Sequence, residues 1–375
     1  MTGDHNNTMT TRMTTGMTTR RGLGLYGLAT ALLTALLGMH EPISAETAVP
    51  TLLARKAHLE VCTGRDVPDG GGSDVVTALA AMPDGNHLLL GCRSGAVELR
   101  TLNGQLRFRQ QPKPLQVQSV AVTSDGKLLF SLAGDSIHRW SSSGEPRGSF
   151  NTATGEAGRC EGCDTRVMVI SPDGSSLLTG HADGSAALWN AEGVQLRRFE
   201  DPSSGSLVDQ VAFDPSGSSI AIGEETGTVR RWNTTSGRLL SEIDTGLENL
   251  DALAITASGD VWAAGWYGAG RWDLLGRRQT TLRENAMVGY FQALPSGTAV
   301  VLGGAQYADN FFEIRDIRGQ PVMNLRIHDE WAKEGNGLPS VTTKGGLVLV
   351  SADGRLLYMA DGDWVYLWDL PENSP

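Results

Sequence analysis

Residues 171–190 read SPDGSSLLTGHADGSAALWN and contain the unit from which most of the chain is built. Asp173-Gly174 is a tight-turn pair, because glycine readily adopts the positive φ that hairpin turns need. The run Leu177–Thr179 is too short for a helix and is bounded by turn residues, so it predicts a β-strand. A second Asp-Gly turn and a third apolar run, which ends at Trp189, complete the unit.

The same unit recurs along the chain beyond residue 74. Its first turn lies at Asp84-Gly85, Asp125-Gly126, Asp173-Gly174, Ser216-Gly217, Ser258-Gly259, Ser296-Gly297 and Asp353-Gly354. Its third run ends at Leu99, Trp140, Trp189, Trp232, Trp272, Arg315 and Trp368. In five of these seven units the Trp follows the turn Gly by 13 to 15 residues, so five of the nine Trp share one repeat position.

Each unit also has a further strand after the Trp, such as residues 193–199 in the third unit. The pattern therefore predicts an all-β fold of small, four-stranded antiparallel sheets. Such a sheet cannot bury both of its faces alone, so neighbouring sheets must stack. A large aromatic residue repeated on the third strand is suited to wedge between the stacked sheets.

This unit resembles the repeat of the WD-repeat family, whose seven-unit members close into a β-propeller. The resemblance covers about residues 75–371 and is closest at residues 171–190 and 351–370. It implies a seven-bladed β-propeller of four-stranded antiparallel blades. Trp-Asp pairs occur only at Trp272-Asp273 and Trp368-Asp369, and Gly180-His181 lies only eight residues before Trp189. We therefore expect the hydrogen-bonded tetrad of the family to be missing in most blades.

The last unit ends too close to the C-terminus to contain its own fourth strand. Residues 46–74 hold an apolar segment, Thr51–Val61, followed by a Gly-rich linker, Gly70–Gly72. An open ring would expose two sheet edges, and pairing the two ends of the propeller removes them. We expect Thr51–Val61 to form the outermost strand of the last blade, beside residues 346–370.

Residues 1–45 have the features of a signal peptide. Arg20 and Arg21 precede an uncharged stretch, 22–39, and Ala45 is a suitable small residue for cleavage. The pair of Arg is compatible with either general secretion or twin-arginine export. We expect a periplasmic or extracellular protein, with an uncleaved membrane anchor as the alternative, and membrane association only in that case.

Four cysteines follow the predicted cleavage site: Cys62, Cys92, Cys160 and Cys163. An even number in an exported chain favours disulfides. A Cys62–Cys92 bond would lock the closing strand to the first blade, and Cys160 would then pair with Cys163. The alternative is a thiol redox site at Cys160 and Cys163, although that motif normally opens a helix in another fold.

The longest departures from the repeat predict the binding face. In a propeller the connections between blades and the turns between second and third strands share one rim, and the extra residues fall there, at 151–164, 201–207, 304–311 and 326–345. Insertions on one face of a repeat protein usually bind partners. Aromatic residues of the type enriched at interfaces lie on the same rim. They are Trp266, Tyr267, Tyr307, Phe311 and Trp331.

Charge and motifs limit the class of function. The net charge of −11, without a Lys/Arg cluster, argues against nucleic-acid binding. The chain contains no nucleophile elbow, HExxH or phosphate-loop motif. We therefore expect a monomeric protein-interaction scaffold rather than an enzyme, without a cofactor or metal. The alternative is a propeller hydrolase or redox enzyme, using channel residues, the Cys160 and Cys163 pair, or His328-Asp329-Glu330 in the rim loop.

Overall fold

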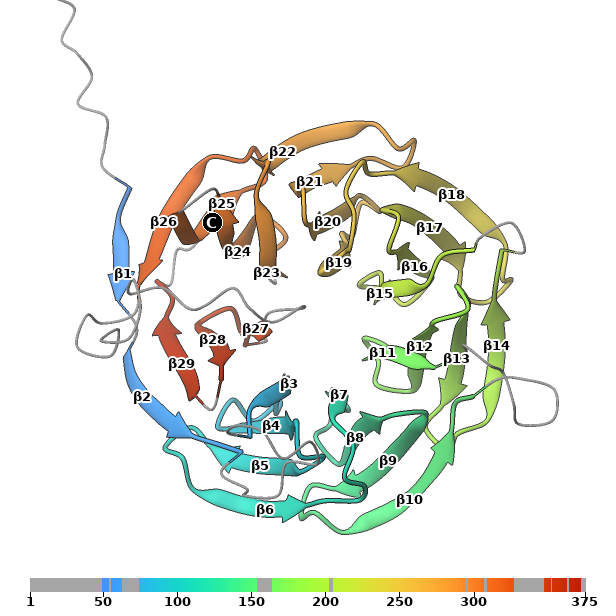
Figure 1. Cartoon of the computed structure of the whole chain (residues 1–375), viewed down its shortest axis with the longest axis vertical. Coiled ribbons are helices and arrows are strands. Elements are labelled where there is room, and N and C mark those ends of the chain that lie inside the picture. Colours follow the sequence, from blue (N-terminus) through green and yellow to red (C-terminus); the bar gives the residue numbers. More distant parts are fainter. Residues whose placement is uncertain are drawn as a thin grey trace, which may run out of the picture. The chain divides into compact units, whose positions relative to one another are not determined.

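The computed structural model describes residues 49–53, 55–62, 74–153, 164–201, 205–294, 296–306, 309–326, 347–351, 353–362 and 364–371. They belong to one compact unit that begins at Val49. In these residues the strands form seven sheets placed around a ring, and no helix occurs (Figure 1). The predicted all-β, seven-bladed β-propeller is confirmed. No described segment is a helix of the length and hydropathy that crossing a membrane requires.

The strands of the first four blades follow one another in sequence, from the innermost strand to the outermost. They are β3 (Val76–Ala81), β4 (His87–Cys92), β5 (Val97–Thr101) and β6 (Leu106–Gln110) in blade 1; β7 (Val117–Val122), β8 (Leu128–Ala133), β9 (Ser136–Ser141) and β10 (Pro146–Asn151) in blade 2; β11 (Thr165–Ile170), β12 (Ser176–His181), β13 (Ala186–Asn190) and β14 (Gln195–Phe199) in blade 3; β15 (Val208–Phe213), β16 (Ser219–Glu224), β17 (Thr228–Asn233) and β18 (Leu239–Asp244) in blade 4.

The remaining blades include the two N-terminal strands. They contain β19 (Ala252–Ile255), β20 (Val261–Gly265), β21 (Gly268–Trp272) and β22 (Arg278–Glu284) in blade 5; β23 (Met287–Ala293), β24 (Ala299–Gln306), β25 (Asp309–Asp316), β26 (Pro321–Arg326) and β1 (Thr51–Leu53) in blade 6; β27 (Leu347–Val350), β28 (Leu356–Asp361), β29 (Trp364–Asp369) and β2 (Arg55–Glu60) in blade 7.

The predicted turn pairs connect the first and second strands of the blades. In blade 3 the Gly174 amide donates to the Ser171 carbonyl at 2.8 Å, and Gly174 has φ of 74°. Its counterparts also have positive φ, which L-residues with a side chain rarely adopt. They are Gly85, Gly126, Gly217, Gly259, Gly297 and Gly354.

In the blades that have it, the repeated Trp packs the blade against the preceding one, as the sequence predicts. Trp189 of blade 3 lies in one apolar cluster with Phe130 and Leu132 of blade 2, and its ring centroid is 5.7 Å from that of Phe150. Trp272 packs in the same way against blade 4, and Trp368 against blade 6. At each of these blade–blade interfaces the buried Trp side chain supplies apolar contact area that a single four-stranded sheet lacks.

One expected repeat position is wrong. Leu88 pairs with Arg100 in blade 1, just as Leu129 pairs with Trp140 in blade 2. Arg100, and not Leu99, therefore occupies the Trp position of blade 1. Blade 6 has Arg315 at this position, as expected. In both blades a Glu two residues earlier faces the Arg: Arg100 Nε lies 2.6 Å from Glu98 and Arg315 Nε lies 2.7 Å from Glu313.

The N-terminal segment closes the ring, but over two blades instead of one. β2 pairs antiparallel with β29 and completes blade 7, which confirms the predicted closure. β1 does not join blade 7. It runs parallel to β26 in blade 6, where Thr51 lies opposite Asn324. The two strands thus follow the outer edges of adjacent blades (Figure 1).

Candidate functional site

The β20–β21 turn presents two aromatic side chains to solvent. Trp266 is 46% exposed and Tyr267 is 52% exposed. The Trp266 amide donates to the Glu248 carbonyl at 3.0 Å, and the Tyr267 carbonyl accepts from the Asn285 amide at 3.1 Å. The turn is therefore held between the β18–β19 and β22–β23 connections, and its backbone is fixed while its side chains stay accessible.

Glycine is required at the end of this turn. Gly268 has φ of 136°, and a Cβ there would lie 2.2 Å from the Arg283 carbonyl oxygen. An L-residue would be strained and would also collide with the neighbouring connection. The glycine thereby allows the aromatic turn to sit directly on the β22–β23 connection.

Met287 extends this surface, although nothing in its sequence context marks it as a binding residue. It follows the same β22–β23 connection and is 41% exposed. Exposed Glu225 and Glu248 lie on the other side of the aromatic pair. The Glu225 carbonyl accepts from the Asn249 amide at 2.8 Å, which joins the β16–β17 turn to the β18–β19 connection. We refer to Glu225, Glu248, Trp266, Tyr267 and Met287 as the rim strip.

The other predicted binding residues have different environments. Phe311 is half-buried against the apolar cluster of blades 5 and 6, and the Arg283 guanidinium lies 4.5 Å from its ring centroid. It supports its own blade and adds little to an open surface. Tyr307 and Trp331 lie outside the described residues, as do His328-Asp329-Glu330.

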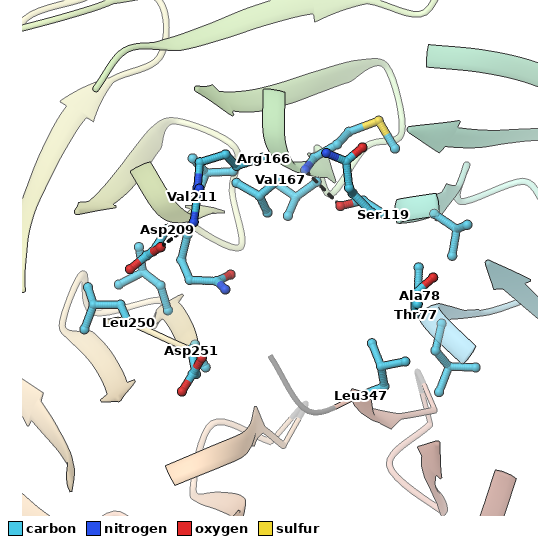
Figure 2. A pocket seen from close by; sticks show the side chains of 18 of the residues that line it. Thr77, Ala78, Ser119, Arg166, Val167, Asp209, Val211, Leu250, Asp251 and Leu347 are labelled. Carbon is cyan, nitrogen blue, oxygen red and sulfur yellow. Dashed lines mark hydrogen bonds and ion pairs between the residues drawn. The ribbon is translucent and has the colours of Figure 1, made fainter. Parts of the chain in front are cut away.

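A cavity of about 540 Å³ occupies the central opening of the propeller. Its wall comes from the innermost strands, and Arg166, Asp209 and Asp251 lie around it (Figure 2). Arg166 Nη2 is 3.2 Å from Asp209 Oδ1, and the Asp209 side chain is only 2% exposed. Gln118 donates through Nε2 to the Thr165 carbonyl at 2.8 Å. The cavity is polar and contains both signs of charge.

The cavity and the rim strip are at the same end of the strands. Asp251 ends the β18–β19 connection that also carries Glu248, and its amide donates to the Ala264 carbonyl at 2.9 Å. The connection therefore leads from the outer rim to the cavity wall.

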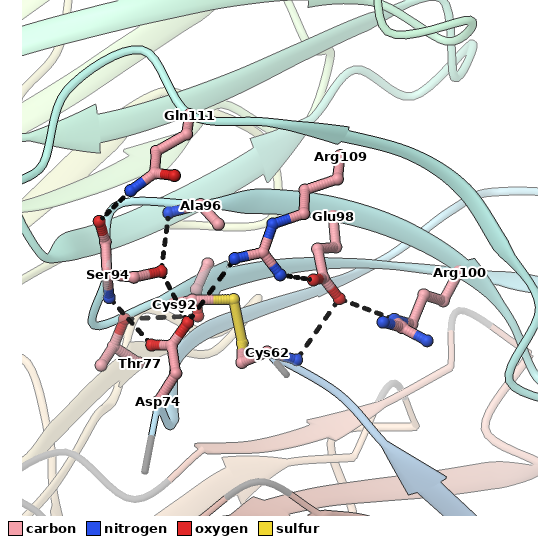
Figure 3. A network of polar contacts seen from close by, with 11 residues as sticks. Cys62, Asp74, Thr77, Cys92, Ser94, Ala96, Glu98, Arg100, Arg109 and Gln111 are labelled. Atoms are coloured by element: carbon pink, nitrogen blue, oxygen red, sulfur yellow. Dashed lines mark hydrogen bonds and ion pairs between the residues drawn. A yellow bond between two sulfur atoms is a disulfide. The ribbon is translucent and has the colours of Figure 1, made fainter. Parts of the chain in front are cut away.

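The disulfide predicted between Cys62 and Cys92 is present and lies in a buried polar cluster (Figure 3). Glu98 Oε2 accepts from Arg100 and Glu98 Oε1 from Arg109, each at 2.6 Å, and the Cys62 amide also donates to Oε2, at 3.4 Å. Asp74 accepts from the Ser94 amide and hydroxyl at 2.9 and 2.6 Å.

This cluster also contains three potential metal ligands: the sulfurs of Cys62 and Cys92 and an oxygen of Asp74 lie within 4.8 Å of one another. Metal binding requires thiolates, and the disulfide uses both sulfurs. The cluster therefore has a structural role in the oxidised protein. Cys160 and Cys163 lie outside the described residues.

Blade 3 contains a buried hydrogen-bond chain around its Trp. Trp189 Nε1 donates to Thr179 Oγ1 at 2.9 Å, and this oxygen is 3.0 Å from His181 Nε2. His181 Nδ1 lies 3.2 Å from Thr165 Oγ1. The sequence places His181 away from the repeat start, and the structure agrees, since His181 ends β12. His181 nevertheless takes part in a hydrogen-bond network that resembles the tetrad of the family. In blade 4, Trp232 Nε1 has no partner among the described residues.

The architecture defines the class: a seven-bladed β-propeller of repeated four-stranded units. Residues 157–190, which include most of blade 3, match the family described as WD domain, G-beta repeat. The protein is therefore a seven-bladed β-propeller that contains a repeat of the WD type. This fold commonly serves as a protein-interaction scaffold.

Proposed function

We propose that the protein is an exported scaffold that binds a protein partner through the rim strip. The observation that supports this most strongly is the pair Trp266 and Tyr267, exposed side by side on a turn that is hydrogen-bonded from both flanks. Trp and Tyr are enriched among the residues that dominate binding energies. A turn that is already ordered adds little entropy cost when the partner binds.

The predicted aromatic residues Tyr307 and Trp331 belong to the same proposed binding face. They lie on the long connections that the repeat pattern assigns to this rim, and we propose that they enlarge the contact beyond blade 5. The protein is proposed to bind its partner as a monomer. The ring is closed, so the first and last blades face each other and neither is left open to pair with a second copy.

Export is proposed from residues 1–45 together with the Cys62–Cys92 bond. Disulfides persist in oxidising compartments and are rare in the cytosol. The partner would then be a periplasmic or extracellular protein. Expression of the full chain, followed by fractionation and mass measurement of the mature protein, tests this. A mature chain that starts near residue 46 supports export, and a cytosolic full-length chain contradicts it.

The binding proposal is tested by capture from the matching cell fraction. Trp266→Ala/Tyr267→Ala should reduce recovery of the specific partner by about tenfold or more, because the variant removes both exposed rings. Leu274→Ala/Leu275→Ala is the matched control. It truncates two exposed apolar residues on the β21–β22 turn, at the other end of the strands.

The two variants separate specific binding from general stickiness. Equal recovery with wild type and with the Trp266 and Tyr267 variant would exclude the rim strip as the binding surface. Equal loss in both double variants would show non-specific apolar adsorption. Thermal unfolding of each variant should match wild type, since the four side chains are exposed.

A further inference from the structure

The exposed apolar part of the rim strip lies beside segments that carry exposed acidic residues. Glu225 and Glu248 are exposed, and backbone hydrogen bonds connect their segments to Asn249 and Trp266. Further inward, Asp251 and Asp209 contribute carboxyl groups to the cavity wall. Asp209 is paired with Arg166 on that wall, so the exposed acidic residues of the rim strip are Glu225 and Glu248.

The nearby guanidinium groups are already engaged by other carboxylates. Arg230 contacts Glu224 and also Glu242, the latter at 2.8 Å. Arg283 lies 2.7 Å from Glu313, and Arg166 pairs with Asp209 at 3.2 Å. These cations neutralise buried or partly buried acids within the blades. The described surface around Trp266 is thus apolar in its centre and negative at its border.

Such a surface selects its partner by charge. Complementary potential accelerates association and disfavours partners of like charge. The net charge of −11 adds a long-range attraction for cations. A Lys or Arg side chain can contact the Glu225 or Glu248 carboxylate and can also stack on the Trp266 ring.

We propose that the rim strip takes a basic polypeptide segment, in which Lys or Arg alternates with apolar side chains. The apolar groups contact Trp266, Tyr267 and Met287, and the cations contact Glu225 and Glu248. This rests on the proposed function, because it names the chemistry of the partner that binds the rim strip.

The test uses fluorescently labelled short peptides and the full propeller. A peptide of alternating lysine and leucine is compared with one of alternating glutamate and leucine, by fluorescence anisotropy. Glu225→Gln/Glu248→Gln removes two charges from the strip with little change in shape. Glu145→Gln/Glu192→Gln, on the turns at the other end of the strands, produces the same change in net charge.

The lysine peptide should bind, and the strip variant should weaken its binding by about fivefold, as expected for two surface charges. The control variant should stay within about twofold of wild type, and added salt should reduce the difference. Equal weakening in both variants, or equal binding of the glutamate peptide, would overturn the proposal. Absence of binding by the lysine peptide would overturn it as well.

Failure of this inference differs from failure of the scaffold proposal. If Trp266→Ala/Tyr267→Ala abolishes capture of the natural partner and Glu225→Gln/Glu248→Gln leaves it unchanged, the scaffold stands and the basic partner does not. If neither variant alters capture, both proposals fail. Unchanged thermal unfolding of all variants establishes that the differences come from the surface.

Discussion

Cys62 and Cys92 covalently join the end of the N-terminal segment to the second strand of blade 1, with their Cα atoms 5.7 Å apart. The same segment pairs with blade 6 through β1 and with blade 7 through β2. Three consecutive blades are therefore held by about a dozen residues. Loss of the disulfide would free the Cys62 end of this segment and leave the pairing of β1 and β2 to hold the closure.

Cys62→Ala/Cys92→Ala should lower the free energy of unfolding by about 3 kcal/mol, because the bond closes a loop of 30 residues in the unfolded chain. Urea unfolding, followed by far-UV circular dichroism, measures this. Reduction of the wild-type protein should shift its unfolding midpoint in the same direction. A variant as stable as wild type would show that strand pairing alone holds the closure.

The buried Glu98 should be essential to blade 1. Its carboxylate lies between Arg100 and Arg109 and is fully buried, so Glu98→Gln leaves Arg100 without its acid and Arg109 with only Asp74, at 3.9 Å. Removing one partner of a buried ion pair costs about 3–5 kcal/mol. Glu145→Gln, which removes an exposed partner of Arg147, should cost less than about 1 kcal/mol. Similar midpoints of urea unfolding for the two variants would contradict this role.

The fold was predictable because its strongest signals repeat. The Trp189 position and the Gly174 turn recur at regular spacing, and each has a local cause in packing or in φ. Leu99 was assigned to the Trp position of blade 1 because the spacing from the turn Gly varies by two residues among the units, and only the pairing of Leu88 with Arg100 identifies the correct residue. The three residues of β1 were assigned to the wrong blade because so short a strand has no pattern that selects its neighbour.

The candidate site was predictable only in part. Trp266 and Tyr267 stand out because they are aromatic residues in a turn. Met287 and Glu225 are ordinary residues in sequence, and they join the rim strip because connections of neighbouring blades meet there. The hydrogen bonds that join these loops link residues about 20 positions apart in the sequence, and they form only when neighbouring strands and blades are in place. Residue type therefore identified the centre of the surface, and tertiary structure was needed for its border.

Thr179 should stabilise blade 3 through its hydroxyl. Thr179→Val keeps the shape of the side chain but leaves Trp189 Nε1 and His181 Nε2 without this partner in a fully buried site. We expect a loss of about 1–3 kcal/mol, the usual cost of an unsatisfied buried polar group. Ile222→Val, at the matching position of blade 4, should cost about 1 kcal/mol because it removes only one methylene. If urea unfolding shows that Thr179→Val lowers the free energy of unfolding by less than Ile222→Val does, the hydrogen-bond network does not stabilise blade 3.

Stability should fall in acid through the turn aspartates. The Lys127 amide, followed by the Thr123 hydroxyl, lowers the pKa of Asp125 to about 2. Hydrogen bonds from Ser171 and Ser351 lower the pKa of Asp173 and of Asp353. Because each pKa is lower in the folded state, the stabilisation is complete above the unfolded pKa, near 4, and is lost as the pH falls toward 2.

The urea midpoint should therefore decline between about pH 4 and about pH 2, and Asp125→Asn should make the decline shallower. Glu192→Gln removes an exposed carboxyl from the same end of the strands and serves as the control. NMR titration of the Asp125 carboxyl gives an independent measurement, in which Thr123→Val should raise its pKa. If Asp125→Asn and wild type lose stability in parallel as the pH is lowered, this turn does not contribute to the acid sensitivity.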